Sequence, residues 1–375
     1  MKKFLFVIQI FCATSLVLSA QETPHSHALG TSLQFPNILG YQTLKCDFHQ
    51  HTVFSDGEVW PSIRVREALM DNLDVISLTE HLEYQPHLGD IPHKDRNRSY
   101  QIAVKEAKNH ELIIVKGSEI TRTMPPGHSN AIFIEDANKL IANDYLDAFK
   151  EAKNQTAFVF WNHPYETPKN DNVTFLYEAN KKLIDNNLVQ GIEVVNTHTY
   201  SKEALQIAYE NNLTLMGTSD IHGLIDWDYK KGTIGHRPIT LVFSKDKTQN
   251  NIKLALFDHR TVVHYDNTLI GRDSLLIPLI NASLVVKKSF YEPKSKVLSV
   301  ELENVSSCDF ILQNQSEFSL VESTDIIQIA GKVTITLNFR TKEKLNKFDW
   351  KFMALNAVNA PDSHPIINKL ISIQD

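Results

Sequence analysis

Short apolar runs alternate with amphipathic segments over the first two thirds of the chain. Between the runs, segments such as 61–72 and 201–212 repeat apolar residues at helical spacing, and Pro61 suits the first turn of a helix. This alternation is typical of strands joined by helices in a parallel sheet. We therefore predict an α/β fold whose sheet closes as a barrel. The seven runs lie at 44–48, 75–78, 112–116, 131–134, 157–161, 192–195 and 213–216.

The pattern changes after Gly271. Segments 295–305, 308–314, 331–340 and 349–358 alternate apolar and polar positions, and helical spacing becomes rare. We predict a small, sandwich-like all-β domain at residues 269–375, after an N-terminal extension at 21–40 and a barrel at 41–268. The β-rich segment contains no motif that indicates chemistry, so we expect a structural role for it.

The first 20 residues have the pattern of a secretory signal peptide. Two lysines precede an apolar stretch and small residues, and cleavage is expected after Ala20. The apolar stretch is shorter than the ~20 residues that span a membrane. We expect a periplasmic or extracellular protein, free of the membrane after cleavage. The remaining cysteines, Cys46 and Cys308, fall in different predicted domains, so no disulfide framework is indicated.

The net charge of the chain bears on which molecules it can bind. The chain has 375 residues, of which 42% are hydrophobic, and a formal net charge of −6. This charge argues against an extended surface for binding nucleic acid. The composition does not reveal the oligomeric state.

Histidine and acidic residues recur beside the predicted strands. Because the carboxyl ends of barrel strands meet at one mouth, we expect these side chains to converge. Imidazole and carboxylate groups are the ligands that suit zinc, manganese and iron. The set is large enough for two or three divalent ions (Mn²⁺, Zn²⁺ or Fe²⁺), and three dications with three carboxylates leave about +3 to attract an anion. The expected ligands are His49, His51, Asp56, His81, Glu119, His128, His163, Asp220 and His222.

The order of these motifs resembles a known superfamily. "FHQHTVFSDG", "TEH", "GSEIT", "GHSN", "NHP" and "SDIHG" are similar, in this order, to motifs of the PHP (polymerase and histidinol phosphatase) superfamily. Within it, the N-terminal signal, "VWPSIRVREAL", "EYQPH", "DRNRSY" and the β-rich tail resemble the secreted Sb-PDE family of phosphodiesterases. The resemblance covers about residues 41–265. It implies a distorted (β/α)7 barrel with a trinuclear metal centre. Glu80 stands where many members have aspartate.

The resemblance also implies roles for single residues. His49, His51, Glu119 and Asp220 would hold a first ion; Glu119, His128 and His222 a second; Asp56, His81 and His163 a third. From the chemistry of such a centre, and not from the resemblance, we expect a hydroxide bridging two ions to attack phosphorus, with Glu119, Asp220, His222 and the cation Arg237 as the catalytic residues. Arg96, Arg98, His198 and Tyr165 are expected to bind substrate. Tyr84 and Trp227 either shape the pocket or pack beside it, and Glu193 is expected to orient a ligand.

These expectations favour a small phosphate ester as the partner and a secreted, metal-dependent phosphodiesterase as the function. A phosphomonoesterase of the same superfamily, acting on protein tyrosine phosphate or sugar phosphate, is the alternative. A non-catalytic binding protein is a third possibility, with less support because no ligand position is missing.

Overall fold

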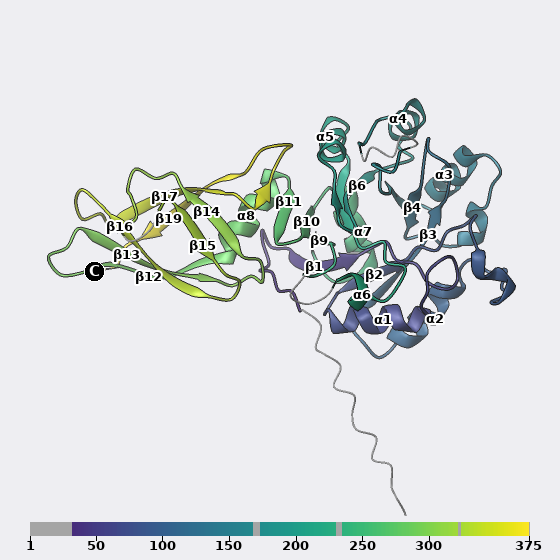
Figure 1. The fold of residues 1–375 in the computed structure, drawn as a ribbon, viewed down its shortest axis with the longest axis horizontal. Coiled ribbons are helices and arrows are strands. Elements are labelled where there is room, and N and C mark those ends of the chain that lie inside the picture. The colour runs from purple at the N-terminus through teal and green to yellow at the C-terminus, as the bar shows by residue number, and fades with distance from the viewer. Residues whose placement is uncertain (1–31, 168–172, 230–234, 322–323, 375) are drawn as a thin grey trace, which may run out of the picture.

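The apolar runs form one curved sheet with helices packed around it (Figure 1). The structure is a computed structural model that describes residues 32–167, 173–229, 235–321 and 324–374. The strands of this sheet are β1 (Gln42–Asp47), β2 (Val75–Leu78), β3 (Ile113–Ile120), β4 (Ser129–Ile132), β5 (Phe158–Trp161), β6 (Gly191–Asn196), β7 (Thr199–Tyr200), β8 (Thr214–Thr218), β9 (Ile239–Ser244), β10 (Thr261–Tyr265), β11 (Thr268–Gly271) and β18 (Ala357–Val358).

Three of the helices around the sheet begin at a residue whose side chain caps the first turn. Asp144, Ser201 and Thr248 each accept a hydrogen bond from a backbone N–H in the first turn of the following helix. Pro61 opens α1, as its missing donor allows. The helices around the sheet are α1 (Pro61–Met70), α2 (Arg98–Ala107), α3 (Tyr145–Asn154), α4 (Glu178–Asp185), α5 (Lys202–Glu210), α6 (Ile225–Asp228) and α7 (Gln249–Phe257), with 3₁₀ turns η1 (Pro86–Gly89) and η2 (Ala137–Leu140).

The sheet is mixed rather than parallel throughout. β1, β2 and β3 pair in parallel, as do β5, β6 and β8. β4 runs antiparallel to both of its neighbours, and β9 runs antiparallel to β1 and β10. The expectation of a parallel sheet is therefore wrong at β4, and β9 lies outside the seven predicted runs. The reversal places the beginning of β4 at the same edge as the carboxyl ends of the strands beside it.

Side chains bridge the gap between β8 and the antiparallel strands. The Thr240 hydroxyl of β9 accepts a hydrogen bond from the Gly217 N–H at 3.0 Å and lies 2.9 Å from the Gly217 carbonyl oxygen. The Thr261 hydroxyl donates to the Leu215 carbonyl at 2.9 Å. These bonds complete a distorted barrel where no strand ladder joins β8 to β9 in the described residues. The predicted barrel fold with an all-β domain after it is confirmed.

The C-terminal strands form two further sheets, separated from the barrel in Figure 1. One consists of β12 (Leu284–Tyr291), β13 (Val297–Asn304) and β16 (Thr334–Arg340); the other of β15 (Ile326–Ile329), β14 (Phe310–Asn314), β17 (Lys347–Ala354) and β19 (Ile366–Ser372). β17 shows the expected alternation, because Phe348, Trp350 and Phe352 are buried and the residues between them are exposed.

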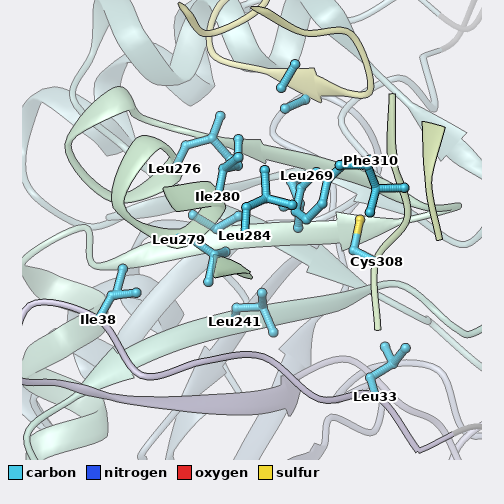
Figure 2. Close-up of a cluster of buried hydrophobic side chains, with 14 of the residues drawn as sticks. Leu33, Ile38, Leu241, Leu269, Leu276, Leu279, Ile280, Leu284, Cys308 and Phe310 are labelled. Atoms are coloured by element: carbon cyan, nitrogen blue, oxygen red, sulfur yellow. The ribbon is translucent and has the colours of Figure 1, made fainter. Parts of the chain in front are cut away.

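A helix that we did not predict joins the two parts. α8 (Asp273–Ser283) follows β11 and ends directly before β12, with Pro278 inside it. Figure 2 shows Leu276 and Ile280 of α8 near Leu269 of β11 and Phe310 of β14. The short strand β18 adds to the barrel sheet beside β11. The boundary that we placed at residues 268 and 269 thus falls within β11, and the β domain's own sheets begin at Leu284.

The N-terminal segment continues this shared core. Leu33 and Ile38 are buried in the same cluster, and Gln34 exchanges hydrogen bonds with Ser307 of the β domain. The expected signal peptide lies outside the described residues. Among those described, no helix is both long and apolar enough to cross a bilayer.

Candidate metal centre

The nine expected ligands meet at one edge of the barrel. They come from the segments that follow β1, β2, β5 and β8, from within β3, and from the position before β4. The antiparallel course of β4 explains why His128 precedes its strand whereas His163 follows β5. Donor atoms lie within 4.8 Å of one another in three groups: His49, His51 and Asp220; His81, Glu119 and His128; and His51, Asp56, His81 and His222.

The first group surrounds one oxygen of Asp220. His49 Nε2 and His51 Nε2 lie 3.0 and 3.1 Å from Asp220 Oδ1. The same two nitrogens lie 3.7 and 3.5 Å from Glu119 Oε2. Two imidazole nitrogens and two carboxylate oxygens thus face one small volume.

The other oxygen of Glu119 faces His128 of the second group and also His163, which belongs to none of the three groups. Glu119 Oε1 lies 2.9 Å from His128 Nδ1 and 3.7 Å from His163 Nε2. The rings of His128 and His163 are 5.0 Å apart. The carboxylate of Glu119 therefore stands between two sets of histidines.

The third group surrounds the Asp56 carboxylate. His222 Nε2 lies 3.2 Å from Asp56 Oδ1, and His81 Nε2 lies 3.3 Å from Asp56 Oδ2. His81 also reaches back to the middle of the centre, since its Nδ1 is 2.8 Å from Glu119 Oε2.

This grouping corrects the assignment that the resemblance implied. The resemblance implied that His222 lies with His128 and that His163 lies with Asp56. In the structure His163 lies beside His128, and His222 lies beside Asp56. His163 lies beside His128 because β4 and β5 are antiparallel neighbours, with Ser129 opposite Trp161. His222 lies beside Asp56 because the loop after β8 packs on the loop after β1, where the Glu58 N–H donates to the His222 carbonyl at 2.9 Å.

The residues fit divalent cations. Asp56 Oδ1, Glu119 Oε2, Asp220 Oδ1 and His128 Nδ1 are buried without a hydrogen-bond partner among the described residues. Buried polar atoms without well-formed hydrogen bonds are costly, and cations bound within the three groups would satisfy them. Neutral nitrogen and carboxylate oxygen are also the donors that zinc, manganese and iron accept.

The pKa of each ligand in the cluster depends on the charges of its neighbours as well as on its burial. Burial alone would raise the pKa of the Glu119 carboxyl, but His81, His128 and His163 hold it well below its usual range. Burial likewise opposes the charged form of His81, yet Glu119 and Asp56 raise the pKa of its imidazole to about 10. At His51 burial dominates and lowers the pKa to about 3. Without metal, protons on histidine balance the carboxylates, so cation binding would release protons.

A layer of buried polar groups orients the ligands. Glu193 Oε1 lies 2.8 Å from His49 Nδ1, which leaves Nε2 of that ring facing the centre. Asn162 donates to Glu119 Oε1 at 2.9 Å, and Asn196 donates to Asp220 Oδ2 at 3.2 Å. The role expected for Glu193 agrees with this contact. We did not predict a role for Asn162 or Asn196, although Asn162 opens the "NHP" motif and Asn196 ends β6.

Glu80 fixes the loop that carries His51 and Asp56. Its Oε2 accepts hydrogen bonds from the Thr52 N–H at 3.1 Å and from the Ser55 hydroxyl at 2.6 Å. Ser55 Oγ in turn lies 3.2 Å from His51 Nδ1. Glu80, at the position where many members of the superfamily have aspartate, thus supports His51 indirectly through Ser55.

The backbone is tightly turned at the ligands. Asp220 and His163 have φ values of 48° and 25°, in the left-handed region that non-glycine residues rarely adopt. A Cβ at Gly57 would lie 2.6 Å from the His51 carbonyl carbon, so the loop after β1 folds back closely on itself.

Arg237 does not lie where we expected it. Its side chain is fully buried, with Nη2 2.7 Å from Asp71 Oδ2 and Nη1 3.3 Å from Asp47 Oδ2. Asp47 also accepts hydrogen bonds from the N–H and hydroxyl of Ser219. The guanidinium therefore neutralises two carboxylates below the ligands, and the expected catalytic contact with substrate is wrong.

The other expected substrate contacts are distributed around the mouth. Arg96 is half-buried and donates to the Leu82 carbonyl, next to His81, at 3.1 Å. Arg98 is exposed on α2 and donates to Gln101, one turn further along the same helix. The Tyr165 hydroxyl reaches Asn196 Oδ1 at 3.2 Å.

The other aromatic side chains expected at the pocket contact three different neighbours. His198 is exposed, with its ring 4.9 Å from that of Tyr229. The Tyr84 ring is 5.9 Å from that of His81. Trp227 lies against Gly223, the neighbour of His222.

The fold and the donor set define a metal-binding α/β barrel with a β domain attached. A model of an Ig-like domain family matches residues 284–369, the two C-terminal sheets. A two-domain protein from Bacteroides vulgatus ATCC 8482, described as containing a predicted PHP-like metal-dependent phosphoesterase, is 38% identical, with a TM-score of 0.85. The alignment covers 92% of this chain and 100% of that one. The chain belongs to this family of PHP-like metal-dependent phosphoesterases, which confirms the resemblance to the PHP superfamily.

Two further similarities are weaker. An 84-residue segment, 22% of this chain, is 33% identical to an uncharacterised protein of Methanocaldococcus jannaschii. That match spans 36% of the curated relative's length. PsfC from Pseudomonas syringae PB-5123 is 17% identical with a TM-score of 0.39, over 60% of this chain and 92% of that chain, which is too distant to bear on function.

Proposed function

We propose that this protein is a secreted, metal-dependent phosphodiesterase. The observation that carries the proposal is the position of Glu119, whose two oxygens face different sets of histidines. A carboxylate in this position suits two neighbouring cations that share it. The cluster around Asp56 could hold a third ion.

Divalent cations at this centre would lower the pKa of a water molecule and would neutralise the oxygens of a phosphate ester. The chain's own residues position this chemistry. Glu119 and Asp220 hold negative charge at fixed points, and Glu193 and Asn196 keep the ligands in orientation. His222, 39% exposed at its side chain, is the ligand most accessible from the mouth and faces an incoming ester.

The charges near the mouth favour a diester over a monoester. A diester carries one negative charge at neutral pH, whereas a monoester carries up to two. Of the three arginines expected to bind phosphate, Arg237 is neutralised by carboxylates and Arg98 donates to Gln101 on its own helix, whereas Arg96 donates to the carbonyl next to His81. This low number of available guanidinium groups suits the smaller charge. It also supports the closer resemblance to the Sb-PDE phosphodiesterases over the phosphomonoesterase alternative.

Exposed aromatic rings at the third group supply a surface for the organic part of an ester. Trp60, Tyr84 and Trp227 are 44%, 53% and 61% exposed, while every other tryptophan and tyrosine that the structure describes is at least half-buried. Each lies within five residues of Asp56, His81 or His222. Flat rings at these positions can stack on a planar group of the substrate.

Secretion is proposed from the N-terminal sequence. Two lysines, an apolar stretch and small residues before position 21 support cleavage and export to the periplasm or beyond. N-terminal sequencing of the protein recovered from a periplasmic extract tests this point. A mature N-terminus near residue 21 is expected, and an intact Met1 in the cytoplasmic fraction would contradict export.

The activity is tested with paired esters. Purified protein supplied with Mn²⁺ or Zn²⁺ should hydrolyse bis(p-nitrophenyl) phosphate faster than p-nitrophenyl phosphate. Faster monoester hydrolysis would instead identify a phosphomonoesterase, and no hydrolysis of either ester would favour a binding protein.

A further inference from the structure

Arg64 of α1 is a buried cation that the chemistry described above does not use. Its side chain is inaccessible to solvent, although it lies on a helix packed outside the barrel. Nη1 lies 2.7 Å from Glu67 Oε2, one turn further along the same helix. A buried guanidinium needs all its donors satisfied, so its remaining contacts identify what it holds.

Those contacts are backbone carbonyls of the two loops that carry metal ligands. Arg64 Nε donates to the His51 carbonyl at 2.9 Å. Nη2 donates to the carbonyls of Ile221 and His222 at 3.1 and 2.8 Å. The loop after β1 and the loop after β8 are therefore joined through one planar group.

Glu67 extends the connection to the next element. Its second oxygen, Oε1, accepts a hydrogen bond from the Ile225 N–H, at the first residue of α6, at 2.9 Å. The loop after β8 is thus fixed on both sides of His222. Arg64 binds the carbonyls of Ile221 and His222, and Glu67 binds the N–H of Ile225.

We infer that Arg64 and Glu67 form a clamp that holds the Asp56, His81 and His222 group in its ligating geometry. The inference rests on the metal centre of the proposed function and not on the choice of ester. His222 and Asp56 are carried by the two clamped loops, and the rings of His51 and His222 stack at 4.3 Å between them. A shift of one loop against the other would separate Asp56 from His222.

His51 of the first group lies on a clamped loop, but the ligands around it are held by other contacts. His49 is oriented by Glu193, Asp220 by Asn196, and Glu119 by Asn162. Loss of the clamp should therefore weaken one ion selectively and leave the ions at Glu119 in place.

The chain provides a matched control on the same helix. Arg66 also pairs with a glutamate, Glu106, at 3.1 Å, but its side chain is 64% exposed and no other hydrogen bond to it is found in the described residues. Arg64→Lys keeps the charge but cannot reproduce the planar fork that reaches three carbonyls. Arg66→Lys makes the same chemical change where nothing is clamped. Glu67→Gln removes the counter-charge while keeping a similar shape.

The experiment measures metal retention. Wild type, Arg64→Lys, Glu67→Gln and Arg66→Lys are loaded with Mn²⁺, dialysed against graded chelator, and analysed for ions per chain, with circular dichroism as a check of folding. Arg64→Lys and Glu67→Gln should lose one ion-equivalent at roughly 10- to 100-fold lower chelator strength than wild type, the range found for groups that orient metal ligands. Arg66→Lys should match wild type.

Two results would overturn the clamp. One is retention equal to wild type in a folded Arg64→Lys protein. The other is loss of all ions together in either clamp variant. If Arg64→Lys does not fold, Glu67→Gln decides, and wild-type retention there refutes the inference. A wild-type protein that binds Mn²⁺ but hydrolyses neither ester would refute the phosphodiesterase proposal and leave the clamp untouched.

Discussion

Removal of the Arg237 guanidinium should destabilise the protein instead of disabling its chemistry directly. Arg237 is fully buried between Asp47, whose side chain is also inaccessible, and Asp71, whose side chain is 11% exposed. Both carboxylates raise the pKa of Arg237 against the effect of burial. In Arg237→Met the side chain keeps much of its volume, but Asp47 loses its counter-charge inside the protein.

The magnitude follows from the burial of that pair. Removal of one partner of a buried ion pair costs about 3–5 kcal/mol of unfolding free energy. For a domain of this size class, a loss of 1 kcal/mol lowers Tm by about 2–4 °C, so Tm should fall by roughly 10 °C. Arg98→Met, at an exposed position on α2, should leave Tm within about 2 °C of wild type.

Calorimetry and steady-state kinetics on the same preparations check this reasoning. A double variant, Arg237→Met with Asp71→Asn, should recover part of the lost stability, because one unpaired charge is removed. The kcat for bis(p-nitrophenyl) phosphate, measured at a temperature where Arg237→Met is folded, should stay within about threefold of wild type. An unchanged Tm with kcat reduced by two orders of magnitude would refute the structural role and restore Arg237 to the substrate.

Three other predictions test separate parts of the structure. Glu193→Gln should weaken binding of the ion beside His49 by roughly 10- to 100-fold in a chelator competition, and unchanged affinity would show that the 2.8 Å contact is dispensable. Burial, and secondarily His236, lowers the pKa of His264 to about 3, so the unfolded chain takes up a proton below its ordinary value of 6.5 while the folded chain does not. His264 therefore lowers the unfolding free energy by up to about 1.4 kcal/mol per pH unit as pH falls from 6.5 toward 3. In urea titrations across this pH range, the unfolding free energy of His264→Gln should decline less steeply than that of wild type. Equal slopes for the two proteins would exclude the effect. Trp227→Ala should raise KM for bis(p-nitrophenyl) phosphate several-fold without changing metal content, because stacking contributes about 0.5–1.5 kcal/mol, and an unaltered KM would remove this ring from the substrate site.

The sequence predicted seven strands of the barrel sheet and the convergence of ligands for a simple reason. Buried strands need apolar runs, and the positions directly after them are fixed relative to one another by the sheet. The runs at 75–78 and 192–195 correspond closely to β2 (Val75–Leu78) and β6 (Gly191–Asn196). Histidine and acidic residues that lie beside such runs are therefore expected to come together, and the nine expected ligands do so.

Strand direction and ligand grouping could not be read in the same way. A run of four apolar residues looks the same in a parallel and an antiparallel strand, so the reversal of β4 was not visible. His163 and His222 both follow strands. Only the packing of their loops decides which carboxylate each one faces.

Buried charge was the least predictable feature. Arg237 precedes a strand near other polar residues, as a substrate-binding arginine would. Its partners Asp47 and Asp71 are 190 and 166 residues away in the sequence, and no local pattern connects them. The contacts of Arg64 with loop carbonyls are equally hidden, because backbone acceptors leave no trace in residue identity.

Metal content of the wild type and of Glu119→Ala, measured side by side by elemental analysis after loading with Mn²⁺, tests the central claim most directly. The two oxygens of Glu119 face separate histidine groups, so the wild type should hold two or three ions per chain and the variant should retain at most one. A wild type that stays empty after loading, or a variant that binds as many ions as wild type, would contradict a shared metal centre at this edge of the barrel.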